Sequence, residues 1–553
     1  MAKKSMDKNY LFIGNMHLGM DDSILSVLGT VASEFNAEVV HLGSRITQDE
    51  RHMLLRREAK LATWGNQLAE AEKALAVKQR EQGKLSDKIS AFLKSEKPSE
   101  KKAGEYYHAQ LALDKKVDAL SERIHNLRER CHITIGENSA LIAAEGARVD
   151  QLNDVFGTVY FLFNKKQTLF GRSCSDMPVG QYMTASCLHP NGDKISSKPI
   201  TDRALTWFSR FKTGFIVPHP TSVLESKNAE GINNAHTYVT TGGLCETVAP
   251  ELTTELNQAI NMPGAVLVCV DGETGEHHTN RIVFRKDSSG NLMTAVDDLV
   301  FKASKVFTPD EIYCVTTDEH VPHHSEAVRA AALNTCKTLL KGSAPVHHVS
   351  LSDLCDCAPF SPWLAKVPLD REGIRVKEDF QALKGYLKPF ADLPLKSKLV
   401  LDSNHHEWLS KYVAQHPELM GVLDWETGEY TQQFTMGYTF LSRQNGNAPI
   451  QRIGDQVSRH GDQEGSLKQA YIAFGQYQCG HWHYRQEWGR CYRLPCACDL
   501  DPKYLQGRLT GWTQGFTLNA VVKGKTMVTP RVVFSTGDTI RYCYRGKIVR
   551  IQK

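Results

Sequence analysis

The sequence predicts an α/β protein in which short buried strands alternate with helices. The apolar run 311–315 ends at a polar cluster, and the stretch 325–340 that follows has the apolar spacing of a helix. A second apolar run, 346–351, comes next, so the three segments form a β-α-β unit. Near the end of the chain, residues 506–553 alternate with a period of two, which predicts the strands of a second sheet.

Five polar clusters follow one another in the second half of the chain, and three of them come directly after a predicted strand. They are residues 318–320, 352–356, 403–406, 460–462 and 480–483. Their carboxylates, amide and imidazoles are the ligand types that a pair of borderline divalent ions needs. Because the carboxyl ends of neighbouring strands meet at one edge of a sheet, we expect the clusters to converge there.

The order and spacing of these clusters resemble the calcineurin-like metallophosphoesterase superfamily, whose pattern is D-x-H, G-D-x-x-D, G-N-H-D/E, a lone H and G-H-x-H. The first cluster reads TDEHVPHHSEA and the last reads GHWH, and both agree with that pattern. The chain departs from it at Ser352 and Ser403, where glycine is usual, and at His406, where an acidic residue is usual. The resemblance implies a four-layer α-β-β-α sandwich.

The resemblance also implies a centre of two divalent metal ions, with Mn²⁺ expected and Mg²⁺, Fe²⁺ or Zn²⁺ as alternatives. The implied ligands are Asp318, His320 and His483 for one ion, Asn404, His460 and His481 for the other, and Asp353 as the bridge. His405 then has a free imidazole beside the site, suited to protonate the leaving alkoxide as a general acid. The family forms no phospho-enzyme, so water attacks the phosphorus directly.

Composition gives an ordinary globular balance, with 553 residues, 41% hydrophobic residues and a net charge of +4. No apolar run is long enough for a membrane span, and the first residues lack the apolar stretch of a signal peptide. We therefore expect a cytoplasmic protein, in the host cell if it is viral, without a membrane partner. The fourteen cysteines are expected to be reduced thiols. A zinc site at Cys479, Cys491, Cys496 and Cys498 is the less favoured alternative, because two C-x-x-C pairs are missing.

The first half of the chain, residues 1–295, resembles a degenerate copy of the second half, 296–553. The matching positions are Asn15 and His17 for D-x-H, Ser44 for the second cluster, 133–139 for the third, His219 for the lone histidine, and Gly242 and Gly243 for G-H-x-H. Without the carboxylates, this half is expected to hold no dinuclear centre. An unrelated α/β domain is the alternative.

An insertion at residues 50–131 is predicted to form an antiparallel coiled-coil hairpin. Leucines recur every seven residues at 54, 61, 68 and 75, and a second apolar seam runs from 113 to 127 after a break containing proline and glycine. Its basic residues indicate either contact with nucleic acid or a solvated helix face balanced by glutamates. Self-association is equally compatible, so a homo-oligomer is expected.

Together these features predict a two-metal phosphodiesterase that acts on DNA, that is, a nuclease. The resemblance is to phage metallophosphoesterases of the DNA-degrading type, including the early host-DNA-degradation proteins of large lytic phages, and distantly to the SbcCD-type repair nuclease. The basic C-terminal strands, with Arg541, Arg545, Lys547 and Arg550, are a candidate path for the phosphate backbone or carry edge-strand charges. The alternatives are a phosphatase or phosphodiesterase on nucleotides or phosphoproteins, and a structural assembly protein with a vestigial site.

Overall fold

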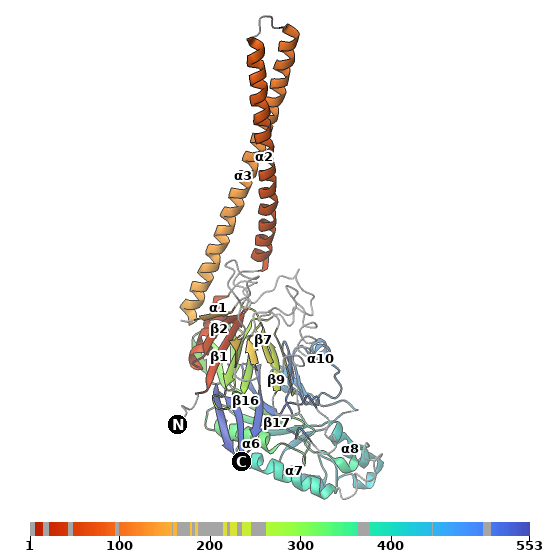
Figure 1. Cartoon of the computed structure of the whole chain (residues 1–553). Coiled ribbons are helices and arrows are strands. Elements are labelled where there is room, and N and C mark those ends of the chain that lie inside the picture. The colour runs from red at the N-terminus through yellow and green to blue at the C-terminus, as the bar shows by residue number, and fades with distance from the viewer. Residues whose placement is uncertain are drawn as a thin grey trace. The chain divides into compact units, whose positions relative to one another are not determined.

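The protein is a mixed α/β chain with several sheets (Figure 1). The computed structural model describes residues 6–14, 21–42, 48–94, 99–156, 159–162, 177–179, 183–185, 214–217, 222–228, 235–244, 262–362, 375–444, 446–501 and 510–553. The chain divides into two compact units, one made of Met1–Arg45 and Leu152–Lys553 and the other of Ile46–Gln151.

An eight-stranded sheet contains the strands that the apolar runs predict. The strands predicted from residues 506–553 lie in this same sheet, so the expectation that they form a second sheet is wrong. In sheet order its strands are β19 (Thr439–Leu441), β18 (Ser397–Leu401), β17 (Val346–Ser350), β16 (Glu311–Thr316), β25 (Gly515–Val522), β26 (Lys525–Thr536), β27 (Thr539–Tyr544) and β28 (Lys547–Gln552). The first four are parallel, and the last four are joined by antiparallel pairs. The candidate ligand clusters that follow β16, β17 and β18 therefore lie at one edge of the parallel half of the sheet.

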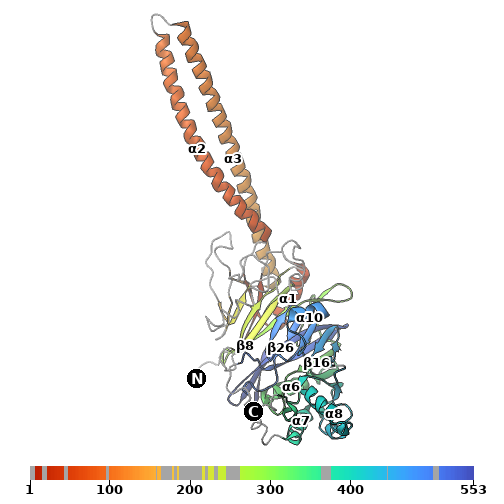
Figure 2. The same ribbon diagram turned by 90° about the vertical axis from the view of Figure 1, so that its right-hand side faces the viewer.

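Three helices pack on one face of this sheet: α6 (Glu326–Leu339), α7 (Val376–Ala391) and α8 (Asn404–Gln415) (Figure 2). Their buried residues, such as Ala331, Phe380 and Leu409, share one apolar cluster with the sheet strands. The side chains of Ser325 and Ser403 cap α6 and α8 by accepting backbone N–H groups of the first turn. The cap at Ser403 fixes where Asn404 and His405 begin the helix.

A second sheet of ten strands packs against the opposite face of the first. Its order is β20 (Gln451–Ile453), β21 (Gln456–Arg459), β22 (Tyr477–Cys479), β24 (Cys491–Arg493), β23 (Gln486–Trp488), β8 (Val223–Asn228), β9 (Ala235–Thr240), β7 (Gly214–Val217), β5 (Met183–Ala185) and β4 (Met177–Pro178). Val315, Val349 and Leu494 belong to the apolar cluster between the two sheets. Helix α10 (Leu467–Phe474) packs on the ten-stranded sheet through Leu467 and Ala470.

The first half of the chain forms a five-stranded sheet in the order β11 (His277–Val283), β10 (Gly264–Val270), β1 (Lys8–Gly14), β2 (Glu38–Leu42) and β3 (Val159–Leu162). The directions of these strands match β26-β25-β16-β17-β18 one for one. Helix α1 (Asp22–Glu34) follows β1 and packs on this sheet, as α6 follows β16. A smaller sheet of β12 (Arg285–Lys286), β13 (Leu292–Val296), β14 (Leu299–Lys302) and β15 (Lys305–Phe307) comes next.

The ten-stranded sheet has the same arrangement on both sides of its central antiparallel pair, β23·β8. Moving outward from either strand, the pairings are antiparallel, parallel, parallel and antiparallel. Backbone hydrogen bonds repeat as well: Gly264 N–H donates to Gly243 as Gly515 N–H donates to Cys496. Gly243 in the first half is therefore equivalent to Cys496 in the second, so the prediction that Gly242 and Gly243 stand at the position of G-H-x-H is wrong.

Two other expectations about the first half change. Residues 133–139, predicted as a strand and a changed third cluster, lie inside helix α3 (Glu100–Phe156). The third parallel strand is instead β3, because the whole helical insertion occupies the crossover after β2. Asn15, His17, Ser44 and His219 lie outside the described residues.

The boundary predicted at 295/296 does not separate two compact units, because strands from both halves share the ten-stranded sheet. A buried ion pair joins the halves there: Arg281 Nε lies 2.6 Å from a carboxylate oxygen of Glu487, whose other oxygen accepts from Arg485. The C-terminal arginines are engaged in the same way. Arg541 pairs with Glu276, Arg545 with Asp298, and Arg550 with Asp271. Among the described residues, these arginines therefore bind acidic groups and form no free basic path; Glu276 and Asp271 belong to the first half, and Asp298 lies just beyond it.

The helical unit consists of α2 (Gln48–Leu93) and the longer α3. Arg128 pairs with Glu72 at 2.7 Å, and Phe92 packs on Tyr106, so the two helices run antiparallel (Figure 1). Ala71, Ile124 and Leu127 are buried on the predicted seams. Neither of these helices, nor any other in the described part of the chain, is long and apolar enough to cross a membrane.

Candidate metal centre and active site

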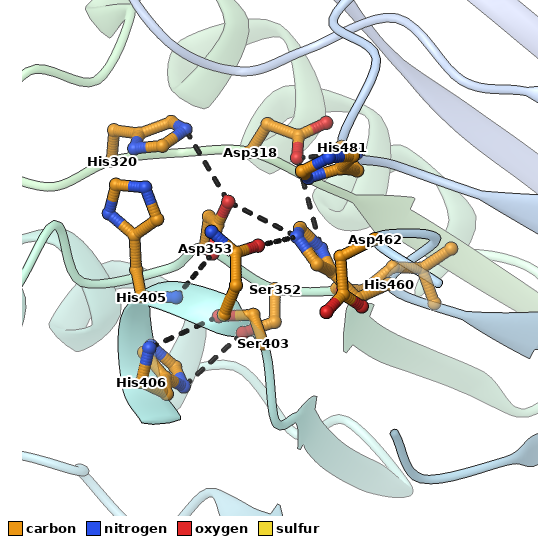
Figure 3. Close-up of polar contacts among 12 residues, drawn as sticks. Asp318, His320, Ser352, Asp353, Ser403, His405, His406, His460, Asp462 and His481 are labelled. Carbon is orange, nitrogen blue, oxygen red and sulfur yellow. Dashed lines mark hydrogen bonds and ion pairs between the residues drawn. The ribbon is translucent and has the colours of Figure 1, made fainter. Parts of the chain in front are cut away.

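The predicted site residues come together where strand ends of the two large sheets meet (Figure 3). Asp318 and His320 follow β16, Asp353 follows β17, and Asn404 and His405 open α8 after β18. From the ten-stranded sheet, His460 follows β21, and His481 and His483 follow β22. All eight side chains are buried or half-buried.

Asp353 lies at the centre of the group. One of its carboxylate oxygens, Oδ2, is 3.2 Å from Nε2 of His460 and 3.7 Å from Nε2 of His320. The other oxygen lies 3.3 Å from the backbone nitrogen of His405. Asp353 therefore faces residues of both predicted ligand sets, as a bridging carboxylate must.

The first ligand set contains Asp318, His320 and His483. The Nε2 atoms of the two histidines are 3.3 Å apart, and Nε2 of His483 lies 3.8 Å from Oδ1 of Asp318. The other carboxylate oxygen of Asp318, Oδ2, is buried and has no hydrogen-bond partner. A buried carboxylate oxygen without a donor, beside two converging imidazole nitrogens, fits a cation.

The second set is built around His460. Its Nε2 lies 2.8 Å from the amide oxygen of Asn404, and its Nδ1 lies 3.2 Å from the carbonyl oxygen of Leu351. Ligand atoms of Asp353, His460 and His481 lie within 4.8 Å of one another. The carboxylate, amide oxygen and imidazoles again fit a borderline divalent ion.

Asp356 is a site residue that the sequence prediction did not select. Its Oδ1 lies 2.9 Å from Nδ1 of His320 and 3.2 Å from Nδ1 of His405. Burial opposes ionisation of Asp356, but the hydrogen bonds with these two histidines outweigh burial and lower its pKa. Asp356 thus orients one candidate ligand and the candidate acid together. The second aspartate of the G-D-x-x-D pattern was the signal that could have found it.

Burial and neighbouring charges shift the pKa values of the central groups in opposite directions. Burial raises the pKa of Asp318 to about 6. Burial also opposes ionisation of Asp353, but the charges of His405 and His460 outweigh it and lower that pKa. Burial lowers the pKa of His481 to about 4, so its imidazole is neutral and available as a ligand near neutral pH.

The backbone is strained where the side chains are presented. The residues with positive φ here are Asp318 (53°), His320 (49°), Ser352 (91°), Asp353 (51°), His481 (67°) and His483 (59°). Such conformations cost about 1–3 kcal/mol each for residues other than glycine and persist only where the surrounding structure enforces them. Their concentration in this group indicates that the fold holds these side chains in place for a function.

A cavity of about 460 Å³ opens onto the group. Its lining includes His320, Asp353, Asn404, His405, His481 and His483. Trp408 and Trp512 form part of the same lining. Substrate of small cross-section can therefore reach both candidate ligand sets and His405 from one side.

The structure does not bring the four candidate zinc cysteines together. In the described residues, Cys496 and Cys498 lie with His483, and Nδ1 of His483 is 3.7 Å from Sγ of Cys498. Cys479 and Cys491 are buried elsewhere in the ten-stranded sheet and join no such group. Buried free thiols, the favoured expectation, describe them.

No family model matches the chain, and no curated protein matches it. Among solved structures, it is similar to the crystal structure of Chaetomium thermophilum Vps29, with 13% identity and a TM-score of 0.21. That similarity covers 28% of this chain and 76% of Vps29. At so low a TM-score it carries no argument about the site.

Proposed function

We propose that the protein is a metal-dependent phosphodiesterase of the calcineurin-like type that hydrolyses DNA. The observation that carries the proposal is Asp353 between two sets of candidate ligands, with His405 alongside. Two bound divalent ions would supply activated water and would neutralise charge on the phosphate. No other motif in the described chain offers a comparable group of buried carboxylates and imidazoles.

The protein residues then have distinct tasks. Asp318, His320 and His483 would hold one ion, and Asn404, His460 and His481 the other. Nδ1 of His405 is hydrogen-bonded to Asp356, so Nε2 remains available to contact the substrate. His405 would therefore give its proton to the leaving oxygen.

We also propose that the fold is an α-β-β-α sandwich that occurs twice in the chain. Helices on one sheet, two packed sheets and α10 on the second sheet agree with an α-β-β-α arrangement. The strand-for-strand correspondence between the halves supports descent of residues 1–295 from a second copy of the domain. We propose that this copy is structural and that it completes the ten-stranded sheet.

DNA is the proposed substrate because the enzyme carries a second domain and a long helical insertion that a small-molecule phosphodiesterase does not need. The test is hydrolysis of linear, circular and single-stranded DNA, and of bis(p-nitrophenyl) phosphate, with Mn²⁺ or Mg²⁺. Cleavage of DNA supports the proposal. Hydrolysis of the small diester alone favours a nucleotide or phosphoprotein substrate, and no hydrolysis with either ion favours a structural protein.

A further inference from the structure

Five aromatic rings form a continuous row along the candidate site. In order they are Trp408, His405, His320, His483 and Trp512, with centroid distances of 4.0, 4.7, 5.1 and 4.2 Å between neighbours. The three central rings are the candidate acid and two candidate ligands. The two tryptophans are the ends of the row, and both line the cavity.

The two tryptophans differ from the tryptophans of the core. Trp425 and Trp488 are 3% and 9% exposed, and both belong to apolar clusters between secondary-structure elements. Trp408, which packs against the edge of the cluster that contains Trp425, and Trp512 are only half-buried, and both line the cavity. Trp408 lies one helical turn after His405 on α8, so its position is fixed relative to the candidate acid.

The cavity limits what can reach these rings. A volume of about 460 Å³ lies in the range of pockets that enclose one small ligand, about 300–1,000 Å³. In a duplex the bases stay in the stack, so only an unpaired segment can bring its bases as well as its phosphate into this space. A base released from its stack needs a new partner, and an aromatic face accepts any base.

We propose that Trp408 and Trp512 stack the two bases that flank the scissile phosphate, and that the substrate is therefore unpaired DNA. This inference rests on the proposed phosphodiesterase function. Because Trp408 contacts His405, it takes the base on the side of the leaving oxygen, and Trp512 takes the other base. Because an aromatic face stacks on any base, we expect cleavage to tolerate all four bases.

The test compares single-stranded oligonucleotides that carry a normal base or an abasic residue on one side of a single cleavable phosphate, with the other linkages made resistant. Product ends identify the side of the leaving oxygen. Wild type is expected to lose about 5- to 150-fold in kcat/KM for each abasic residue, the range of base–aromatic stacking. Trp408→Ala should remove that penalty on the leaving side only, and Trp512→Ala on the other side only.

The quantity compared is the ratio of kcat/KM for the normal and the abasic oligonucleotide. If a tryptophan substitution only displaced His405, both values of kcat/KM would fall equally and the ratio would stay the same, whereas loss of stacking changes the ratio. Trp408→Phe should keep most of the penalty. Tyr412→Ala is the matched control, since Tyr412 lies on the same helix, is 38% exposed and packs on Phe360 outside the cavity lining. Its ratio should equal that of wild type.

Equal kcat/KM for normal and abasic oligonucleotides in wild type, or a penalty that both alanine variants leave unchanged, overturns the stacking proposal. So does duplex cleavage at the single-strand rate. In each case DNA is still hydrolysed, and the proposed function stands. Absence of hydrolysis of every phosphodiester, including bis(p-nitrophenyl) phosphate, overturns the proposed function and the stacking proposal with it.

Discussion

The hydroxyl oxygen of Ser352 lies 3.3 Å from Nδ1 of His406. The other ring nitrogen, Nε2, is 3.1 Å from the backbone nitrogen of Cys355 and accepts its N–H. Burial lowers the pKa of His406 to about 3, so the ring is neutral and its Nδ1–H donates to Ser352. These contacts fix the loop that presents Asp353.

We expect His406→Ala to destabilise the protein, because it leaves the buried N–H of Cys355 without a partner, at a cost of about 1–3 kcal/mol. Ser352→Gly removes the hydroxyl but also relieves the positive φ, so its own effect should be small. A double-mutant cycle by urea unfolding should give a coupling of about 0.5–1.5 kcal/mol. Strictly additive effects would contradict the contact.

His405→Ala should lower the rate of phosphodiester hydrolysis by about 10²–10⁴-fold while both metal ions remain bound, because His405 is proposed as an acid and not as a ligand. Turnover and metal content are measured on the same preparation. His416→Ala is the control, since His416 is the C-cap of the same helix, pairs with Glu418 and does not line the cavity. Loss of both ions from His405→Ala would show that His405 is a ligand.

The stability of the fold should fall below pH 6.5 because of His348. Its ring is buried against Phe390 and lies 2.8 Å from the hydroxyl of Tyr438. Burial lowers its pKa to about 3, whereas the unfolded chain takes up the proton near 6.5. The unfolded state is therefore favoured progressively as the pH drops from 6.5 towards 3. His348→Gln should flatten this part of the urea-unfolding profile, and an unchanged slope would contradict the assignment.

The helical unit should not be needed for hydrolysis of a small diester, but it should be needed for cleavage of DNA or for oligomerisation. Removing residues 73–127 and joining the ends with a short Gly/Ser linker cuts both helices at one level, because Glu72 pairs with Arg128. Hydrolysis of the small diester should persist, since every candidate ligand lies after residue 317. DNA cleavage or oligomeric mass should decrease. If neither changes, the insertion serves neither purpose.

The site in the second half was predictable because β16, β17 and β18 are short apolar runs that each end at a motif. Asp318, Asp353 and Asn404 follow β16, β17 and β18 as expected. Ser403 replaces the usual glycine without backbone strain, because its φ is −134°. The first half was harder to predict. Residues 133–139 have a strand-like composition, yet they continue a helix of 57 residues, because tertiary context overrides local propensity.

Asp356 was missed for a different reason. It binds no proposed ion, so a search for metal ligands does not select it, although it is the second aspartate of the G-D-x-x-D pattern. Its role lies in the contacts of its Oδ1 with Nδ1 of His320 and Nδ1 of His405. The pairing of Arg541 and Arg545 with Glu276 and Asp298 is equally non-local. A sequence pattern shows that these residues are basic but not that acids more than 240 positions away neutralise them.

Binding of Mn²⁺ to the metal-free protein tests the central claim most directly. Calorimetric titration of wild type should give two ions per chain, and the restored enzyme should hydrolyse bis(p-nitrophenyl) phosphate. Asp353→Asn and His481→Ala should keep the fold, measured by circular dichroism, but bind fewer ions and lose turnover, because each removes a bridging charge or a ligand. Fewer than one ion per chain in wild type, or near-normal turnover in either variant, would contradict the account.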